Sequence, residues 1–250
     1  MILPQKFLTL PIAHRGLHGP GIPENSLAAA QAAIDAGYGI ELDIQPSSDG
    51  VAMVFHDYDL HRLTGREGRV DGLDAATLGQ VALLGSAETV PTLAQFLDLV
   101  SGRVPLLIEI KDQPDGQGGQ AVPLHVPVAE ALKGYAGPVA LMSFNPQIVA
   151  AFHAIAPEIP VGLTTCAFAA GDFPTLSEQE REHLAAITDY DAVGASFISH
   201  DHHDLDNPRV DALKAMGAGI LCWTIRSPGQ EAAARRIAHN ITFEHYPAPK

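Results

Sequence analysis

Short apolar segments alternate with helical segments along all 250 residues of the chain. This pattern constrains the fold more than any other feature, because strands that are separated by helices pair in parallel. The apolar segments have the length and the flanking turns of buried strands, and the segments between them have the composition of helices. We therefore predict an α/β protein built around a parallel sheet.

Nine segments qualify as strands, one more than a closed barrel of eight strands holds. One of the nine is therefore misassigned or is a short accessory strand. Residues 57–91 are rich in Gly, Asp and Arg, and we interpret them as a small excursion over the barrel mouth, within a single domain that covers 1–250. The predicted strands are the segment that ends at Ala13 and residues 40–45, 51–55, 106–110, 139–144, 161–165, 192–198, 220–225 and 241–243. The predicted helices are residues 27–34, 92–100, 126–133, 146–155, 177–187, 210–216 and 229–239, and a polar loop is predicted at 112–120.

Chemically active side chains cluster where four of these strands end. In barrels of alternating strands and helices, catalytic groups lie at the carboxyl ends of the strands. Four strand ends would bring two imidazoles, three carboxylates, a guanidinium and an ammonium to one rim, a set that can bind a divalent cation, hold a phosphate and transfer protons. These residues are His14, Arg15, Glu41, Asp43, His56, Glu109 and Lys111.

The carboxylates of Glu41, Asp43 and Glu109 have two interpretations. They are either surface charges at strand ends or oxygen ligands of a hard cation such as magnesium, calcium or manganese. Glu41 and Asp43 share one face of their strand, and two carboxylates on one face are costly in a dry core unless a cation lies between them. Lys111, two residues after Glu109, adds a cation for a phosphate and favours the metal site.

His14 and His56 are each followed by a charged residue at a strand end. A single histidine at such a position is more often structural than catalytic, and the presence of two shifts that balance. Phosphodiester cleavage needs a base for the attacking hydroxyl and an acid for the leaving alkoxide, and histidine serves in both roles near neutral pH. The histidine-rich run at 200–204 is interpreted as a solvated loop. Trp223 is either a core residue or a wall of the substrate pocket.

The charge of the chain excludes some partners. The net charge is −14 and the pI is near 5.1, so the basic surface that sequence-independent nucleic-acid binding requires is lacking.

The two cysteines, Cys166 and Cys222, are too few for a disulfide framework, and we expect reduced thiols in a cytoplasmic protein. The N-terminus lacks the features of a signal peptide, and no apolar run approaches the ~18 residues of a membrane span. The oligomeric state is left open.

A series of short motifs is more specific in its order than any one motif is alone. The motifs are His14-Arg15-Gly16, Pro23-Glu24-Asn25-Ser26, Glu41-Leu42-Asp43, Ser48-Asp49-Gly50, Phe55-His56-Asp57, Leu60-x-Arg62-x-Thr64-Gly65-x-x-Gly68, Pro91-Thr92-Leu93, Glu109-Ile110-Lys111, Ser143-Phe144 and Trp223-Thr224-Ile225. In this order they resemble the glycerophosphodiester phosphodiesterase family, and the resemblance covers nearly the whole chain, from Ile12 to Ile225.

The resemblance implies a (β/α)₈ TIM barrel with a short insertion after the third strand, of the kind shared with phosphatidylinositol-specific phospholipases C. It implies an enzyme that uses one divalent cation, Mg²⁺ or Ca²⁺, to hydrolyse small glycerophosphodiesters to sn-glycerol 3-phosphate and an alcohol. The implied residues are Glu41, Asp43 and Glu109 on the cation, His14 and His56 as the acid–base pair, Arg15 and Lys111 on the phosphate, Glu24 near the metal or His14, and Phe144 and Trp223 as apolar walls near the glycerol.

Two departures from the family pattern lie near the C-terminus. Arg226 stands where the family commonly has asparagine. The family's closing Ile-Thr-Asp-x-Pro is replaced by Ile241-Thr242-Phe243-Glu244-His245-Tyr246-Pro247. The catalytic positions are intact, so these departures bear on the substrate rather than on the reaction class. The alternatives are a lysophospholipase D, which takes a substrate with one acyl chain, and a non-catalytic phosphodiester-binding module.

Overall fold

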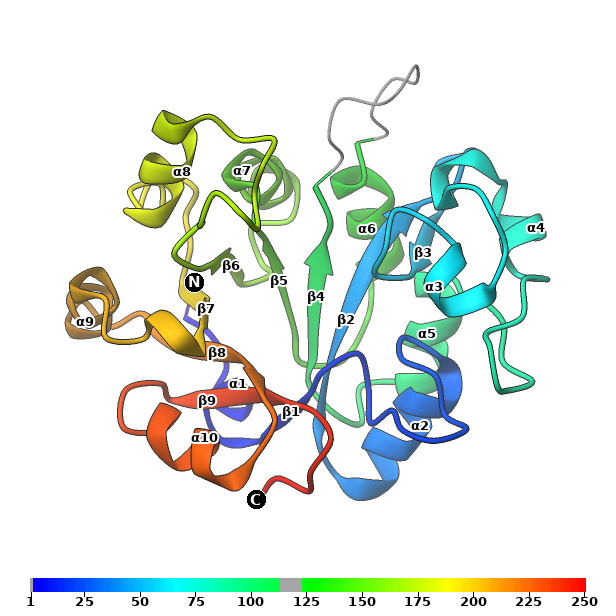
Figure 1. The fold of residues 1–250 in the computed structure, drawn as a ribbon, viewed down its shortest axis with the longest axis horizontal. Helices are drawn as coiled ribbons and strands as arrows, with labels where there is room; N and C mark the ends of the chain where they lie inside the picture. Colours follow the sequence, from blue (N-terminus) through cyan, green and yellow to red (C-terminus); the bar gives the residue numbers. More distant parts are fainter. Residues whose placement is uncertain (1, 113–122) are drawn as a thin grey trace. The chain divides into compact units, whose positions relative to one another are not determined.

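The computed structural model describes residues 2–112 and 123–250, which form two compact units. The first unit is Ile12–Val139, and the second is Met1–Pro11 together with Ala140–Lys250. Figure 1 labels the elements in chain order. The loop predicted at 112–120 lies outside the described residues, apart from Asp112.

Three parallel strands form the centre of the first unit. Strand β2 (Gly39–Pro46) pairs with β1 (Ile12–Ala13) on one side and with β4 (Leu106–Ile110) on the other, as Figure 1 shows for β2 and β4. Helix α2 (Leu27–Ala36) connects β1 to β2, and the Ser26 side chain caps it by accepting from the Ala29 N–H. Gly37 ends α2 in the left-handed conformation, which glycine adopts more readily than other residues. This unit also contains α5 (Leu93–Val100) and α6 (His125–Leu132).

Strand β3 (Ala52–Val54) is the accessory strand among the nine candidates. It pairs antiparallel with β2, so that Val54 lies opposite Ile44 and Ala52 opposite Pro46. The expectation that His56 follows a parallel strand was therefore wrong. Because β3 runs back along β2, the residues after it return to the middle of β2 instead of continuing past its end.

The excursion after β3 has a small apolar core of its own. It contains helix α3 (His61–Thr64), the 3₁₀ turn η1 (Val70–Gly72) and helix α4 (Ala75–Leu78). Its buried side chains pack with those of β3 and the residue that follows it, which gives this short insertion a fixed structure. The cluster consists of Met53, Phe55, Leu60, Val70, Leu78, Val81, Leu83 and Val90.

Five parallel strands form the second unit, and within it each strand pairs with the next one in the chain. They are β5 (Val139–Ser143), which begins at the unit boundary, β6 (Val161–Thr165), β7 (Phe197–Asp201), β8 (Gly219–Ile225) and β9 (Asn240–Phe243). The intervening helices are α7 (Pro146–Ile155), α8 (Glu178–Ala185), α9 (Pro208–Ala215) and α10 (Pro228–Ala234), and α1 (Gln5–Thr9) precedes them in the chain. Among the described residues, no helix is long and apolar enough to cross a membrane.

Strand β7 corrects two sequence predictions. The strand begins at Phe197 rather than at 192, because the Val193 N–H donates to the Asp189 carbonyl and residues 191–194 form a turn. The interpretation of 200–204 as a solvated loop was wrong for His200, which lies in β7 and is fully buried. Burial is tolerated because both ring nitrogens have partners: Nδ1 is 2.7 Å from Thr165 Oγ1, and Nε2 is 3.1 Å from Asp204 Oδ2.

Candidate active site

The two segments that carry His14 and His56 reach the same stretch of β2. Strand β1 runs parallel to the first half of β2 and β3 runs antiparallel to the second half, both on the edge opposite β4. The Gly16 N–H donates to the Glu41 carbonyl at 3.2 Å, and the Phe55 N–H donates to the Asp43 carbonyl at 3.0 Å. The chain thus brings both histidines beside the carboxylates of β2 from opposite directions.

Glu41, Asp43 and Glu109 form a compact buried cluster. Asp43 and Glu109 are register partners in the β2–β4 pair, and one carboxylate oxygen from each of the three residues lies within 4.8 Å of the others. None of the three is more than 5% exposed. Burial and the neighbouring charges of Asp43 and Glu109 raise the pKa of Glu41 well above its usual range. The register of β2 and β4 thus brings these three residues together.

Lys111 and Arg15 supply positive charge to this cluster. Lys111 Nζ donates to Glu109 Oε1 at 2.5 Å and lies 2.7 Å from Asp43 Oδ1. Arg15 Nε lies 3.4 Å from Asp43 Oδ2. Burial opposes ionisation of Asp43, but the charge of Lys111 and those of the neighbouring basic groups outweigh it and lower the pKa of Asp43 below its usual range. The same carboxylates raise the pKa of Lys111 against the effect of burial, so the ammonium stays charged.

A tight turn after β1 places His14. Arg15 has a left-handed backbone, with φ of 55°, and its N–H donates to Glu41 Oε2 at 3.0 Å. His14 Nε2 is 3.9 Å from the same oxygen, and its side chain is 13% exposed. Gly16 completes the turn with φ of 78°, and a Cβ there would lie 2.8 Å from Ala29 in α2. Gly16 therefore allows α2 to pack closely against the His14 turn.

Asn25 is a site residue that sequence reasoning quoted in a motif but did not assign. Its Nδ2 donates to Asp43 Oδ2 at 2.9 Å, its Oδ1 accepts from the Asp43 N–H at 3.3 Å, and it is 1% exposed. Both polar atoms of the amide therefore hold Asp43. Its backbone has a φ of 56°, a left-handed conformation that asparagine adopts more readily than most residues.

His56 is held by the residue that follows it. Its Nδ1 is 2.7 Å from Asp57 Oδ1, and its carbonyl accepts from Gln45 Nε2 at 3.0 Å. Burial opposes the charge of Asp57, but hydrogen bonds from His56 and Arg62 lower the pKa of Asp57 below its usual range. Asp57 and Arg62 were not among the assigned site residues. Glu24 lies beside Arg15, whose Nη1 is 2.6 Å from Glu24 Oε1, and it is not one of the three clustered carboxylates.

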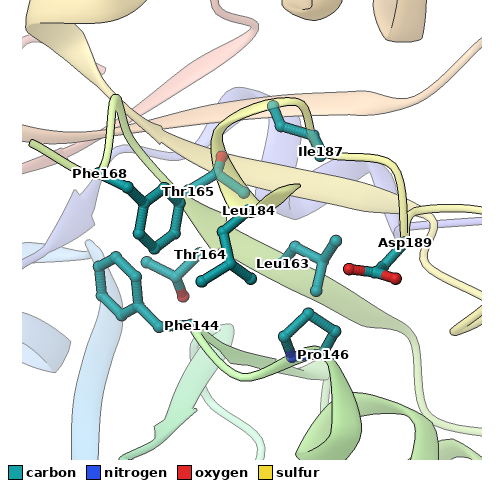
Figure 2. A pocket seen from close by; sticks show the side chains of 9 residues that line it. All are labelled: Phe144, Pro146, Leu163, Thr164, Thr165, Phe168, Leu184, Ile187 and Asp189. Carbon is teal, nitrogen blue, oxygen red and sulfur yellow. The ribbon is translucent and has the colours of Figure 1, made fainter. Parts of the chain in front are cut away.

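Phe144 and Trp223 belong to the second unit, where they pack edge to face with ring centroids 5.7 Å apart. Trp223 Nε1 donates to the Ser199 carbonyl at 2.9 Å. Figure 2 shows Phe144 and Phe168 at one side of a small cavity and Asp189 at the other. The cavity has a volume of about 10 Å³, room for one water molecule at most. It is too small to hold a substrate, and the role of Phe144 and Trp223 as apolar walls near the glycerol stays a prediction.

Comparison with known proteins identifies the family. The model of the glycerophosphoryl diester phosphodiesterase family matches residues 14–242. The chain belongs to this family. The Bacillus subtilis protein YhdW is 28% identical over 241 residues, 92% of this chain and 90% of that protein. The glycerophosphodiester phosphodiesterase of Caldanaerobacter subterraneus is 33% identical over 168 residues, 62% of this chain and 66% of that protein.

A solved structure shows the fold class. A phosphodiesterase from Oleispira antarctica, in complex with the product sn-glycerol-3-phosphate, superposes with a TM-score of 0.79 at 26% identity and covers 97% of this chain and 95% of that one. The fold is a (β/α)₈ TIM barrel, as predicted. The prediction that this chain is an enzyme, a phosphodiesterase, is also confirmed.

Proposed function

We propose that this chain hydrolyses glycerophosphodiesters to sn-glycerol 3-phosphate and an alcohol. The observation that carries the proposal is the meeting of three buried carboxylates, Lys111, Arg15 and two histidines around β2, where β4 contributes Glu109 and Lys111 follows that strand. The names of the relatives point to the same reaction, and the Oleispira structure holds sn-glycerol-3-phosphate as its product.

The residues fit one divalent cation, Mg²⁺ or Ca²⁺. Glu41, Asp43 and Glu109 offer only oxygen donors, which these hard cations prefer. The charges also fit. Burial and the neighbouring carboxylates of Asp43 and Glu109 raise the pKa of Glu41, and a dication between the three carboxylates would offset their mutual repulsion. A bound dication would supply Lewis-acid stabilisation of charge on the phosphate.

Arg15 and Lys111 stabilise the negative charge that grows on the phosphate oxygens in the transition state. Their carboxylate partners fix both groups before substrate arrives, so little reorganisation accompanies the reaction. Despite burial, those carboxylates raise the pKa of both groups, which keeps the two cations charged at any working pH.

His14 and His56 transfer the protons. One removes a proton from the nucleophile, either water or the neighbouring glycerol hydroxyl, and the other protonates the leaving alkoxide. The Asp57 carboxylate on Nδ1 of His56 leaves Nε2 for proton transfer, and His14 lies 3.9 Å from the Glu41 carboxylate. We expect a bell-shaped pH–rate profile, and a flat profile across neutral pH would contradict the paired roles.

The setting that we propose is the cytoplasm, in lipid and glycerol metabolism, with a small-molecule substrate as the partner. The two free and buried thiols of Cys166 and Cys222 support a reducing compartment.

The test is product release from glycerophosphocholine, glycerophosphoethanolamine and a lysophosphatidylcholine, measured as glycerol 3-phosphate and as choline. Protein stripped with EDTA should be inactive, and Mg²⁺ or Ca²⁺ should restore glycerol 3-phosphate release. His14→Gln and His56→Gln should each lower kcat by about 10²- to 10⁴-fold. The matched control is His61→Gln, because His61 is 68% exposed and pairs only with the exposed Glu67 among its ion-pair partners in the described residues.

Choline release from the lysophospholipid alone would indicate a lysophospholipase D. Absence of product from every substrate with either metal would contradict the proposed reaction and favour a phosphodiester-binding module.

A further inference from the structure

Arg62 lies at the surface but is bonded to two side chains that hold the site. It belongs to α3 in the excursion after β3, and its side chain is 48% exposed. Its guanidinium contacts Asp57 and Glu24, whose side chains are only 23% and 13% exposed. Most exposed ion pairs contribute little to stability, but bidentate pairs between an arginine and a carboxylate are an exception.

One side of the guanidinium fixes the carboxylate that holds His56. Arg62 Nε donates to Asp57 Oδ2 at 2.6 Å, and Nη2 donates to Asp57 Oδ1 at 3.0 Å. Asp57 Oδ1 is also the atom that lies 2.7 Å from His56 Nδ1. A carboxylate at Nδ1 sets the orientation and the tautomer of an imidazole. The position of Asp57 therefore decides where the other ring nitrogen of His56 lies.

The other side of the guanidinium fixes the carboxylate that holds Arg15. Arg62 Nη1 donates to Glu24 Oε2 at 2.9 Å, and Nη2 donates to Glu24 Oε1 at 2.8 Å. Glu24 Oε1 also accepts from Arg15 Nη1 at 2.6 Å. Arg62 is thus linked to His56 through the Asp57 carboxylate and to Arg15 through the Glu24 carboxylate.

Only arginine fits this position. Four of its five N–H groups donate hydrogen bonds, two to the Asp57 carboxylate and two to the Glu24 carboxylate. Lysine is a point charge that cannot form two planar pairs. Nη2 also bonds both Asp57 and Glu24, so the two carboxylates approach each other and would repel without a cation between them.

We propose that Arg62 is a positioning residue, which locks His56 through Asp57 and Arg15 through Glu24 in one rigid arrangement. This inference rests on the proposed function, in which His56 transfers a proton and Arg15 binds phosphate. It also gives the excursion a catalytic task, because the residue that links the acid–base group to the phosphate-binding group comes from α3.

The kinetic test compares Arg62→Ala, Arg62→Lys and the control Arg66→Ala. Arg66 is exposed on the same excursion, and no ion pair of its guanidinium is found within the part of the chain that the structure describes. We expect both Arg62 variants to lose about 10²-fold in kcat, as small misplacements of catalytic groups do, with a smaller change in KM. Guanidinium at millimolar concentration should restore part of kcat in Arg62→Ala, and equal methylammonium should not. Wild-type kcat in Arg62→Lys, or a loss that guanidinium does not reverse, would overturn the inference.

A second readout does not depend on activity. The imidazole ¹⁵N shifts of His56, assigned with His56→Gln, report which ring nitrogen carries the proton. We expect the Nδ1–H form in wild type and in Arg66→Ala, and a mixture of both forms in the Arg62 variants. A wild-type pattern in the Arg62 variants would overturn the inference.

The two readouts separate this inference from the proposed function. A wild-type protein that releases no product refutes the proposed function, and the ¹⁵N spectra still decide whether Arg62 holds His56. Circular dichroism checks that each variant is folded. Arg62→Lys keeps the charge and the aliphatic stem, so it carries the test even where Arg62→Ala does not fold.

Discussion

Replacing Glu24 with glutamine removes the carboxylate that Arg15 and Arg62 share, while keeping its shape. Burial opposes the charge of Glu24, but hydrogen bonds from Arg62 and the charge of Arg15 outweigh it and lower the pKa of Glu24 from 4.5 to about 2. Each pKa unit corresponds to about 1.4 kcal/mol, so the carboxylate stabilises the folded state by roughly 3 kcal/mol at neutral pH. Because Arg62 is half exposed and screened by solvent, we expect about 2 kcal/mol in practice.

The sign of the pH dependence follows from the direction of the shift. The pKa of Glu24 is lower in the folded than in the unfolded chain, so the unfolded chain binds the proton first as the pH falls. The stabilisation is therefore complete above the unfolded pKa of 4.5 and is lost as the pH falls toward about 2.

Urea unfolding between about pH 2 and about pH 7 measures this contribution. The difference in unfolding free energy between wild type and Glu24→Gln should be about 2 kcal/mol at neutral pH and should shrink toward zero in acid. Glu67→Gln is the control, because Glu67 is 88% exposed on the same excursion, and it should leave the unfolding free energy unchanged. A difference that stays constant across this range would refute the reasoning, since Glu24 would then act through packing and not through charge.

Two further predictions concern the residues around the His14 turn and the acidic cluster. Gly16→Ala should lower the unfolding free energy by about 2 kcal/mol in urea unfolding, because φ is 78° and the new Cβ would lie 2.8 Å from Ala29. Gly21 has a φ of 77° and no atom within 4 Å of the position that a Cβ would occupy, so Gly21→Ala should lower the unfolding free energy only through backbone strain, by about 1 kcal/mol. Equal losses of unfolding free energy in the two variants would contradict the clash at Gly16. Asn25→Ala should weaken Mg²⁺ or Ca²⁺ binding by about tenfold or more, measured by calorimetry, because the amide holds Asp43 by two hydrogen bonds. Unchanged affinity would show that Asp43 needs no such support.

The sequence predicted most of the fold because its strands are apolar and its helices have clear boundaries. Helix α7 and strand β6 occur at the predicted residues, and α2 begins after Ser26 and ends before Gly37. The end of strand β7 was placed too early, at 198, because the strand continues through the buried His200. The partners that make this burial possible, Thr165 and Asp204, become neighbours only in the folded chain.

The acidic cluster was predictable because strand periodicity and parallel pairing decide it. The register that places Asp43 beside Glu109 follows from where β2 and β4 begin. The direction of β3 follows from the short turn between it and β2 and not from its own apolar residues, since strands joined by a tight turn pair antiparallel. The supporting contacts of Asn25, Asp57 and Arg62 depend on side chains from distant segments, and no local pattern indicates such pairs.

The most direct test of the central claim is a metal titration of EDTA-stripped protein that records binding and glycerol 3-phosphate release in the same samples. The account predicts one tightly bound Mg²⁺ or Ca²⁺ per chain, activity that rises in proportion to occupancy, and loss of both in Glu41→Gln and Glu109→Gln. Full activity in the stripped protein, or metal binding that survives both substitutions, would contradict it.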